Sequence, residues 1–287
     1  MPVAVLAARR ARRSGTAAER LEAALAKHRA TLLKRHRVRN DDQLVALVDD
    51  AGFCFAFTAE AAFPVPGAFD HLATTDEGRK WHWMWGWKDE LAAAKRVYYG
   101  KLLVRKPTFV SLAMLPVFYA VHGRPGELDD HLDDVRSGRV SELGRRIVEH
   151  LAQHGETQTK RMRAQLGVTS DEGRRQYAKA IEDLQRLMYV AHVRAVGDGR
   201  EDYNYTYDLF VRRYPEAVKA AERITSADAA ARLVTGLLAL AGAVTPRQVE
   251  RLFEWDAERA ARATSALEAK GALIRVGANL VLPDLVS

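Results

Sequence analysis

Residues 139–196 read RVSELGRRIVEHLAQHGETQTKRMRAQLGVTSDEGRRQYAKAIEDLQRLMYVAHVRAV, and this stretch decides the fold. Apolar residues first recur at helical spacing, Gly155 then breaks the chain, and two further helical segments follow. The run 189–196, the glycine-containing turn 197–200 and the run 202–210 predict a β-hairpin. Three helices with a tight turn between the second and third, followed by a hairpin, are typical of a winged helix.

The end of the chain repeats this order once. Residues 227–287 contain a helix, a break at Gly242, a short helix, a longer helix and a shorter hairpin. The same spacing separates Gly155, Met162 and Leu166 in the first copy and Gly242, Val249 and Phe253 in the second. We therefore predict an α+β, mostly helical chain, with tandem winged-helix modules (helix-turn-helix plus β-hairpin wing) behind a helical N-terminal region.

The chain of 287 residues divides into four expected parts. They are a basic arm (1–16), a mainly helical N-terminal domain (17–137), a winged-helix module (138–214) and a second winged-helix module (215–287). For the N-terminal domain, a divergent winged helix is the alternative. Within it the pattern predicts helices over 17–36, 88–99 and 109–119, the last kinked at a proline.

The positive charge is concentrated at the start of the chain. The net charge is +7 and the isoelectric point is about 9.5, and residues 1–40 hold eleven Lys and Arg against two Glu. Such a segment can add non-specific affinity for phosphates, and we expect this of residues 9–39. A solvated helix face with a loose arm is the plainer interpretation.

Several protein classes are excluded by the composition. The single cysteine, Cys54, lies in an apolar run and cannot form an internal disulfide, so we expect an inert, buried thiol in a cytoplasmic protein. No stretch has the length of a membrane span, and no nucleotide-binding or hydrolase motif is present. The pair His150 and His154 has no third ligand nearby in sequence, so no metal and no cofactor are expected.

The first winged-helix module carries the basic and polar residues expected to contact double-stranded DNA. They lie at the start of the third helix (Arg174, Arg175, Gln176 and Lys179), on the preceding helix (Lys160, Arg161 and Arg163) and on the wing (Arg194 and Arg200). Ordinary solvated positions are the alternative. The corresponding helix of the second module, 256–263, is small and nearly neutral, so we expect that module to be structural.

Four of the five tryptophans alternate in one run: Trp81, Trp83, Trp85 and Trp87. In a strand all four would lie on one face, whereas in a helix they would spread around the axis and be only partly buried. Core packing and a base-stacking surface are the two competing roles. The same choice, packing on the third helix or stacking on bases, applies to three tyrosines of the wing: Tyr203, Tyr205 and Tyr207.

The chain resembles the AlkZ/YcaQ-type winged-helix DNA glycosylases of bacteria and their AlkZ-related relatives. The resemblance rests on the serial architecture, on residues 81–115 and on residues 138–210. It implies recognition of damaged duplex DNA, such as bulky alkylated or cross-linked bases, by a C-shaped array of modules.

The chain departs from these relatives at the catalytic motif. Those glycosylases carry Gln-x-Gln or Gln-x-Asp in their N-terminal part, whereas here the nearest string, Gln158-Thr159-Lys160, lies in another module and ends in lysine. No catalytic residue can be carried over, because Gln43 is the only glutamine of the N-terminal half. Asp89 and Glu90, beside the tryptophans, are weak catalytic candidates, with helix-capping or ion-pair roles as the alternative.

These observations predict a DNA-binding protein linked to DNA damage recognition or repair, with catalysis unproven. We expect either recognition without excision of a base, or excision by residues other than Gln-x-Gln. A winged-helix transcription regulator is the first alternative, and a protein-interaction scaffold built on winged helices is the second.

Overall fold

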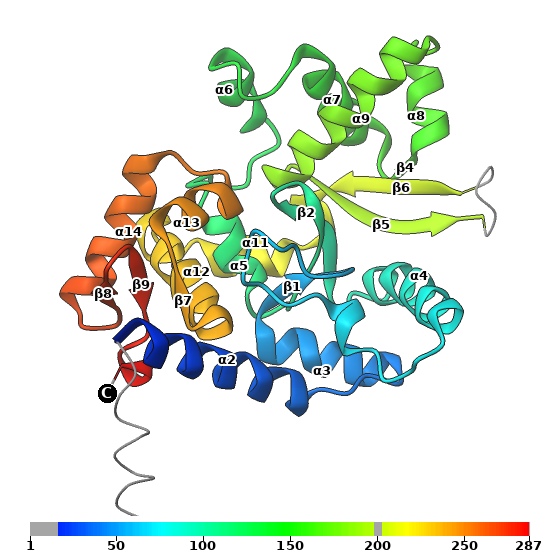
Figure 1. Cartoon of the computed structure of the whole chain (residues 1–287). Helices are drawn as coiled ribbons and strands as arrows, with labels where there is room; N and C mark the ends of the chain where they lie inside the picture. Colours follow the sequence, from blue (N-terminus) through cyan, green and yellow to red (C-terminus); the bar gives the residue numbers. More distant parts are fainter. Residues whose placement is uncertain (1–16, 198–202, 287) are drawn as a thin grey trace, which may run out of the picture.

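The computed structural model describes residues 17–197 and 203–286 (Figure 1). Residues 1–16, which were predicted to form a basic arm, and residues 198–202, which include the predicted contact Arg200, lie outside the described residues. The described chain is a mixed α and β structure with more helix than strand and three small antiparallel sheets. The α+β, mostly helical class predicted from the sequence is confirmed.

The N-terminal part combines helices with one sheet. Its elements are α2 (Ala17–Arg35), α3 (Asp41–Ala51), β1 (Phe53–Phe55), η1 (Ala68–His71), α4 (Glu77–Ala93), β2 (Tyr98–Leu103), β3 (Lys106–Val110) and α5 (Leu115–Ala120). α3 begins at Asp41, because the Asn40 side chain accepts a hydrogen bond from the Gln43 backbone N–H at 2.9 Å.

Two of the helices predicted in this part are wrong. Residues 88–99 are divided between the end of α4 and the start of β2, and residues 109–119 between β3 and α5. The strands here are buried on both sides, so their apolar runs cannot be told from buried helix by periodicity. Pro116 lies in the first turn of α5 instead of kinking a longer helix, since the first turn needs no N–H from proline.

The middle part contains the first predicted repeat. Its elements are α6 (His131–Arg136), α7 (Glu142–His154), β4 (Thr157–Gln158), α8 (Thr159–Gln165), α9 (Asp171–Arg186), β5 (Val190–Val196), β6 (Asn204–Leu209), α10 (Phe210–Arg213) and α11 (Pro215–Ala221). Ser141 and Ser170 cap α7 and α9 through their side chains, which fixes where these helices begin.

The C-terminal part contains the second predicted repeat. Its elements are α12 (Ser226–Ala241), β7 (Ala243–Val244), α13 (Pro246–Phe253), α14 (Ala257–Ala269), β8 (Ile274–Val276), β9 (Asn279–Val281) and η2 (Pro283–Leu285). Thr245 and Gln248 form a reciprocal capping box at the start of α13. Among the described residues, α11 and α12 have the length and apolar character of a membrane span only as a pair bent by 108°, and no single helix has them.

The three parts share one order of elements. Each has a helix, a short strand, two helical segments and a hairpin, and in each sheet the last strand lies between the other two: β1-β3-β2, β4-β6-β5 and β7-β9-β8. The N-terminal part therefore has the same topology as the two repeats that are visible in the sequence, with η1 in place of the second helix.

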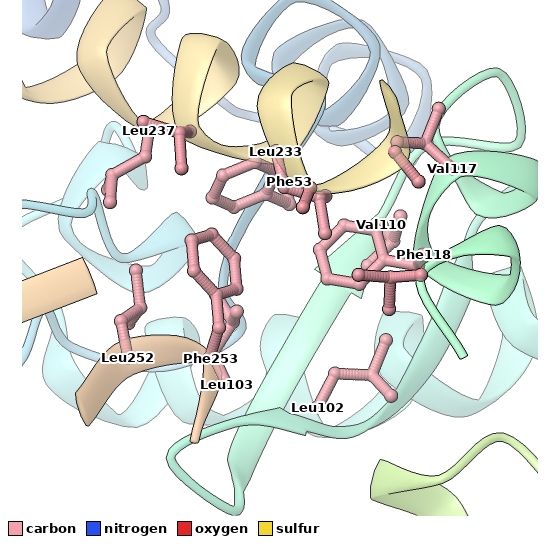
Figure 2. Close-up of a cluster of buried hydrophobic side chains, with 14 of the residues drawn as sticks. Phe53, Leu102, Leu103, Val110, Val117, Phe118, Leu233, Leu237, Leu252 and Phe253 are labelled. Atoms are coloured by element: carbon pink, nitrogen blue, oxygen red, sulfur yellow. The ribbon is translucent and has the colours of Figure 1, made fainter. Parts of the chain in front are cut away.

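One hydrophobic core joins the N-terminal and C-terminal parts (Figure 2). The Phe53 ring of β1 meets Phe118 of α5 edge-on at 5.5 Å and Phe253 of α13 at 6.2 Å. Gly236 of α12 lies over the same ring, and a Cβ there would be 3.1 Å from it. These parts bury their apolar faces against each other, so we expect them to fold as one unit.

A second core cluster lies beneath α4. It contains Met84 and Leu91 of that helix together with Cys54 of β1. Burial raises the pKa of the Cys54 thiol to about 12, so the thiol stays protonated and unreactive, as the sequence predicts.

Candidate nucleic-acid interface

The tryptophan run is helical and not extended. Asp76 caps α4 by accepting a hydrogen bond from the Arg79 N–H at 3.0 Å, and the helix continues through all four indoles. Residues four apart share a face of a helix, so the run divides into two pairs. The sequence alternative of a strand with all four rings on one face is wrong.

The two pairs have different surroundings. Trp83 and Trp87 stack with ring centroids 5.2 Å apart and pack at the edge of the core cluster beneath α4. Trp81 and Trp85 are 50% and 45% exposed, which is unusual for side chains of this size. Core packing therefore describes one pair, whereas the other pair forms an aromatic surface.

The exposed pair borders a groove between α4 and the β5–β6 hairpin, which lie side by side (Figure 1). The groove has a volume of about 560 Å³, within the range of small-molecule sites. Its lining residues are Trp81, His82, Trp85, Gly86, Asp89, Glu90, Ala195, Gly197 and Tyr203. Trp85 and Tyr203 contact each other at its edge, with ring centroids 5.3 Å apart and the ring planes tilted by 40°.

A buried lysine lies behind the groove. Lys88 is 0% exposed, and its Nζ donates hydrogen bonds to Asp89 Oδ2 at 2.7 Å and to the Tyr203 hydroxyl. The same Nζ lies 4.3 Å from the centroid of the Trp85 ring and 4.7 Å from that of Tyr203. Burial lowers the pKa of Lys88, and the carboxylate of Asp89 opposes that shift.

Asp89 is held from two sides at the floor of the groove. Its Oδ2 accepts hydrogen bonds from Lys88 and, at 2.5 Å, from the Tyr203 hydroxyl. Its Oδ1 is buried, accepts no hydrogen bond from the described residues, and lies 3.6 Å from His192 Nε2. Asp89 therefore forms the ion pair that was the alternative to a catalytic role. Glu90 lines the same groove and is exposed.

His192 reaches Asp89 from β5. The register of β5 against β6 shifts between His192 and Arg194, and such a bulge re-aims the neighbouring side chains. The imidazole is 2% exposed, and neither ring nitrogen has a hydrogen-bond partner among the described residues. Burial, reinforced by the charge of Lys88, lowers the pKa of His192 to about 3, so the ring is neutral at pH 7.

The three alternating tyrosines, Tyr203, Tyr205 and Tyr207, have different surroundings. Tyr207 belongs to the core of the middle part together with Tyr177 of α9, which matches the predicted packing on the third helix. Tyr203 instead contacts Trp85 of α4 and reaches the groove, while Tyr205 lies between them against His192.

The basic residues predicted on the middle part lie on its surface. Lys160, Arg161, Arg174, Arg175, Gln176 and Lys179 are exposed, and Arg163 is half-buried. Arg174 pairs with Asp171, Arg175 pairs with Glu172 at 2.7 Å, and Arg194 pairs with Glu156. Exposed pairs of this kind contribute at most about 1 kcal/mol, so these arginines can exchange carboxylates for phosphates.

Only the first turns of α9 are free to meet a partner. Further along the helix, Glu182 pairs with Lys101 and Asp183 pairs with Arg105 at 2.6 Å, both from the hairpin of the N-terminal part. Arg105 also binds Glu254 of the C-terminal part at 3.0 Å. The second half of α9 is thus used to join the three parts.

Sequence reasoning missed Lys88 and His192. A lysine beside tryptophans indicates an exposed helix position, and a histidine in an apolar strand indicates a core residue. Neither residue therefore has a local sequence pattern that predicts a functional site. The glutamines of interest have other roles: Gln43 caps α3 by accepting a hydrogen bond from the Arg39 N–H, and Gln158 accepts one from Asn204.

Comparison with known proteins places the chain in a family. The model of the family described as AlkZ related matches residues 38–254. Among solved structures, the Streptomyces sahachiroi DNA glycosylase AlkZ is similar with a TM-score of 0.58 and 11% sequence identity, over 92% of this chain and 69% of that one. At that identity the likeness shows the fold alone, and no curated protein matches. Because the family model covers most of its length, the chain belongs to the AlkZ-related family.

Proposed function

We propose that this protein binds duplex DNA and recognises damaged or unstacked bases in the groove between α4 and the β5–β6 hairpin. The observation that carries the proposal is the pair of exposed tryptophans that line, together with Tyr203, a groove of about 560 Å³. The family and the fold shared with a DNA glycosylase support a repair-linked role. A cytoplasmic location, where chromosomal DNA is accessible, goes with this proposal.

We infer that each of the three parts is a winged helix. The shared order of elements and the central position of the last strand in each sheet support this inference. In the N-terminal part the third helix is α4, and the wing of the middle part covers one side of it. In the middle part the first turns of α9 remain open, so this module is the one suited to read duplex DNA.

The basic surfaces supply affinity for phosphates. α8 carries three cations and no carboxylate, and α2 presents Arg20, Lys27, Arg29 and Lys34 to solvent. Neutralising each phosphate of duplex DNA changes the slope of log K against log salt by about 0.9. A binding surface of this kind predicts affinity that falls steeply with salt.

The aromatic groove supplies the preference for damage. A base inside a duplex is stacked on its neighbours, whereas a damaged or unpaired base leaves the stack at a lower free-energy cost. Base stacking on an aromatic side chain contributes about 1–3 kcal/mol. Trp81, Trp85 and Tyr203 offer such rings on both sides of the groove.

Replacing Trp81 and Trp85 with alanine should reduce affinity for a duplex with an abasic or alkylated site by about 10- to 100-fold, the loss of one stacked base. Affinity for the undamaged duplex should change little, because phosphate contacts remain. Binding to undamaged, abasic and alkylated duplexes across a salt series measures both. Leu128→Ala, an exposed apolar position on another face, is the control. Equal losses on all three duplexes would argue against lesion recognition by the groove.

Replacing Arg174 and Arg175 with alanine should weaken binding to every duplex. If the side chains read bases, the loss is about 1–3 kcal/mol; if they touch phosphates only, the salt slope becomes shallower. The control is Arg262→Ala, since Arg262 lies on α14 of the C-terminal part in a similar exposed ion pair with Glu258. Unchanged affinity and unchanged slope would remove α9 from the interface.

The same measurements separate the other two functions. A transcription regulator would bind one undamaged sequence tightly, usually as a two-fold dimer. A protein-interaction scaffold would show no salt-dependent affinity for DNA.

A further inference from the structure

We infer that Asp89 is the catalytic carboxylate of a base-excision reaction in the groove, positioned by Lys88 and Tyr203. This inference rests on the proposed function, because it needs a damaged nucleotide to enter the groove. It assigns the catalytic role to a carboxylate, because the N-terminal half of this chain has one glutamine and cannot form the Gln-x-Gln motif of the AlkZ/YcaQ-type glycosylases.

Asp89 is the carboxylate with a fixed position in the groove. Lys88 and Tyr203 both donate to Oδ2, at 2.7 Å for the ammonium and 2.5 Å for the hydroxyl. Catalytic groups need this kind of support, because a side chain held by its neighbours stays in the productive geometry. Glu90 also lines the groove, but it is exposed, and no side-chain hydrogen bond holds it among the described residues.

The Asp89 side chain is 16% exposed at the groove, and one of its carboxylate oxygens lacks a hydrogen-bond donor among the described residues. Its Oδ1 is buried without a hydrogen-bond donor among the described residues, although buried polar atoms are nearly always paired. The nearest group is the imidazole of His192, at 3.6 Å, which is itself buried and has no partner there. Because the imidazole is neutral, it adds no second positive charge beside the carboxylate that Lys88 already pairs with.

The reaction that fits this site is hydrolysis of the N-glycosidic bond. The oxygen of a water molecule forms a bond to C1′ of the deoxyribose, and the C1′–N bond breaks with its electron pair leaving on the base. Asp89 accepts one proton from that water. The carboxylate also stabilises the oxocarbenium-like sugar of the transition state, which is positively charged. The products are the free base and an abasic sugar.

The test uses the full chain and a duplex with a single N7-methylguanine. This base is positively charged and leaves as a neutral molecule without being protonated, so proton transfer from water and charge stabilisation are all that the protein must supply. Base release is followed under single-turnover conditions as abasic sites, and binding to the same duplex is measured in parallel. We expect the unaltered protein to release the base.

Asp89→Asn should slow release by about 10²- to 10⁴-fold, the usual contribution of a general base. Affinity should stay within about threefold, since the aromatic walls are intact. Tyr203→Phe keeps the ring and the Lys88–Asp89 pair but removes one donor, so it tests the positioning even if Asp89→Asn folds poorly. It should slow release by about tenfold or more, the value of a hydrogen bond to a charged group, with affinity unchanged. Glu77→Gln, an exposed carboxylate at the start of α4, should change neither quantity.

Three results would overturn the assignment. They are release by Asp89→Asn at the original rate, release that is lost in Glu90→Gln but kept in Asp89→Asn, and no release by the unaltered protein from this labile base. If the unaltered protein releases no base but still binds the damaged duplex selectively, catalysis is refuted and the proposed function is retained. Loss of lesion-selective binding itself would refute the proposed function.

Discussion

Replacing Lys88 with methionine is expected to lower the free energy of unfolding by about 3–5 kcal/mol, the cost of leaving one partner of a buried ion pair alone. Methionine has a similar length and no charge, so the carboxylate of Asp89 keeps only the Tyr203 hydroxyl. The change also removes the cation that contacts the rings of both Trp85 and Tyr203. We therefore expect the β5–β6 hairpin to lose its attachment to α4.

Urea unfolding followed by tryptophan fluorescence measures this effect. Lys80→Met on the same helix is the matched control: it removes a lysine paired with the exposed Glu77, and such pairs contribute at most about 1 kcal/mol. The double variant Lys88→Met/Asp89→Asn removes both charges and should recover part of the stability. A Lys88→Met protein as stable as the Lys80→Met protein would mean that the buried pair does not hold the groove together.

Replacing Phe53 with alanine is expected to cost about 3–5 kcal/mol, the usual loss for a buried phenylalanine. The ring is 0% exposed, and it contacts Phe118 of α5 and Phe253 of α13 (Figure 2). A Cβ at Gly236 of α12 would be 3.1 Å from it. Because the cavity would open between the N-terminal and C-terminal parts, both should be destabilised together. A single unfolding transition at a lower denaturant concentration is the expected result.

Circular dichroism and tryptophan fluorescence distinguish this outcome from independent domains. Coincident transitions by the two probes indicate one cooperative unit. Leu112→Ala, at an apolar position that is 40% exposed, is the control and should change stability by about 0.5 kcal/mol or less. Two separate transitions in the unaltered protein would show that it does not unfold as one cooperative unit.

The sequence by itself determined the elements that have strong local signals. The sequence alone predicts α7, α9, α12, α13, α14 and the two hairpins, because serine, threonine, aspartate and glycine mark the helix ends and apolar residues recur along the helices. These signals lie within a few residues of each other, so no tertiary information is needed to use them. The helices predicted from local patterns over 88–99 and 109–119 were wrong, because buried strands and buried helices have the same continuous apolar sequence.

The tertiary structure alone decided the site. The alternating pattern of tryptophans left open whether the run is a strand or a helix. Because the run is helical, Trp81 and Trp85 form an exposed surface, whereas Trp83 and Trp87 pack inward. Lys88 and Asp89 meet Tyr203 and His192 because the β5–β6 hairpin lies against α4, which is more than one hundred residues earlier in the chain. Contacts of this kind come from the packing of whole modules, and packing depends on buried apolar surfaces that have no local sequence signature.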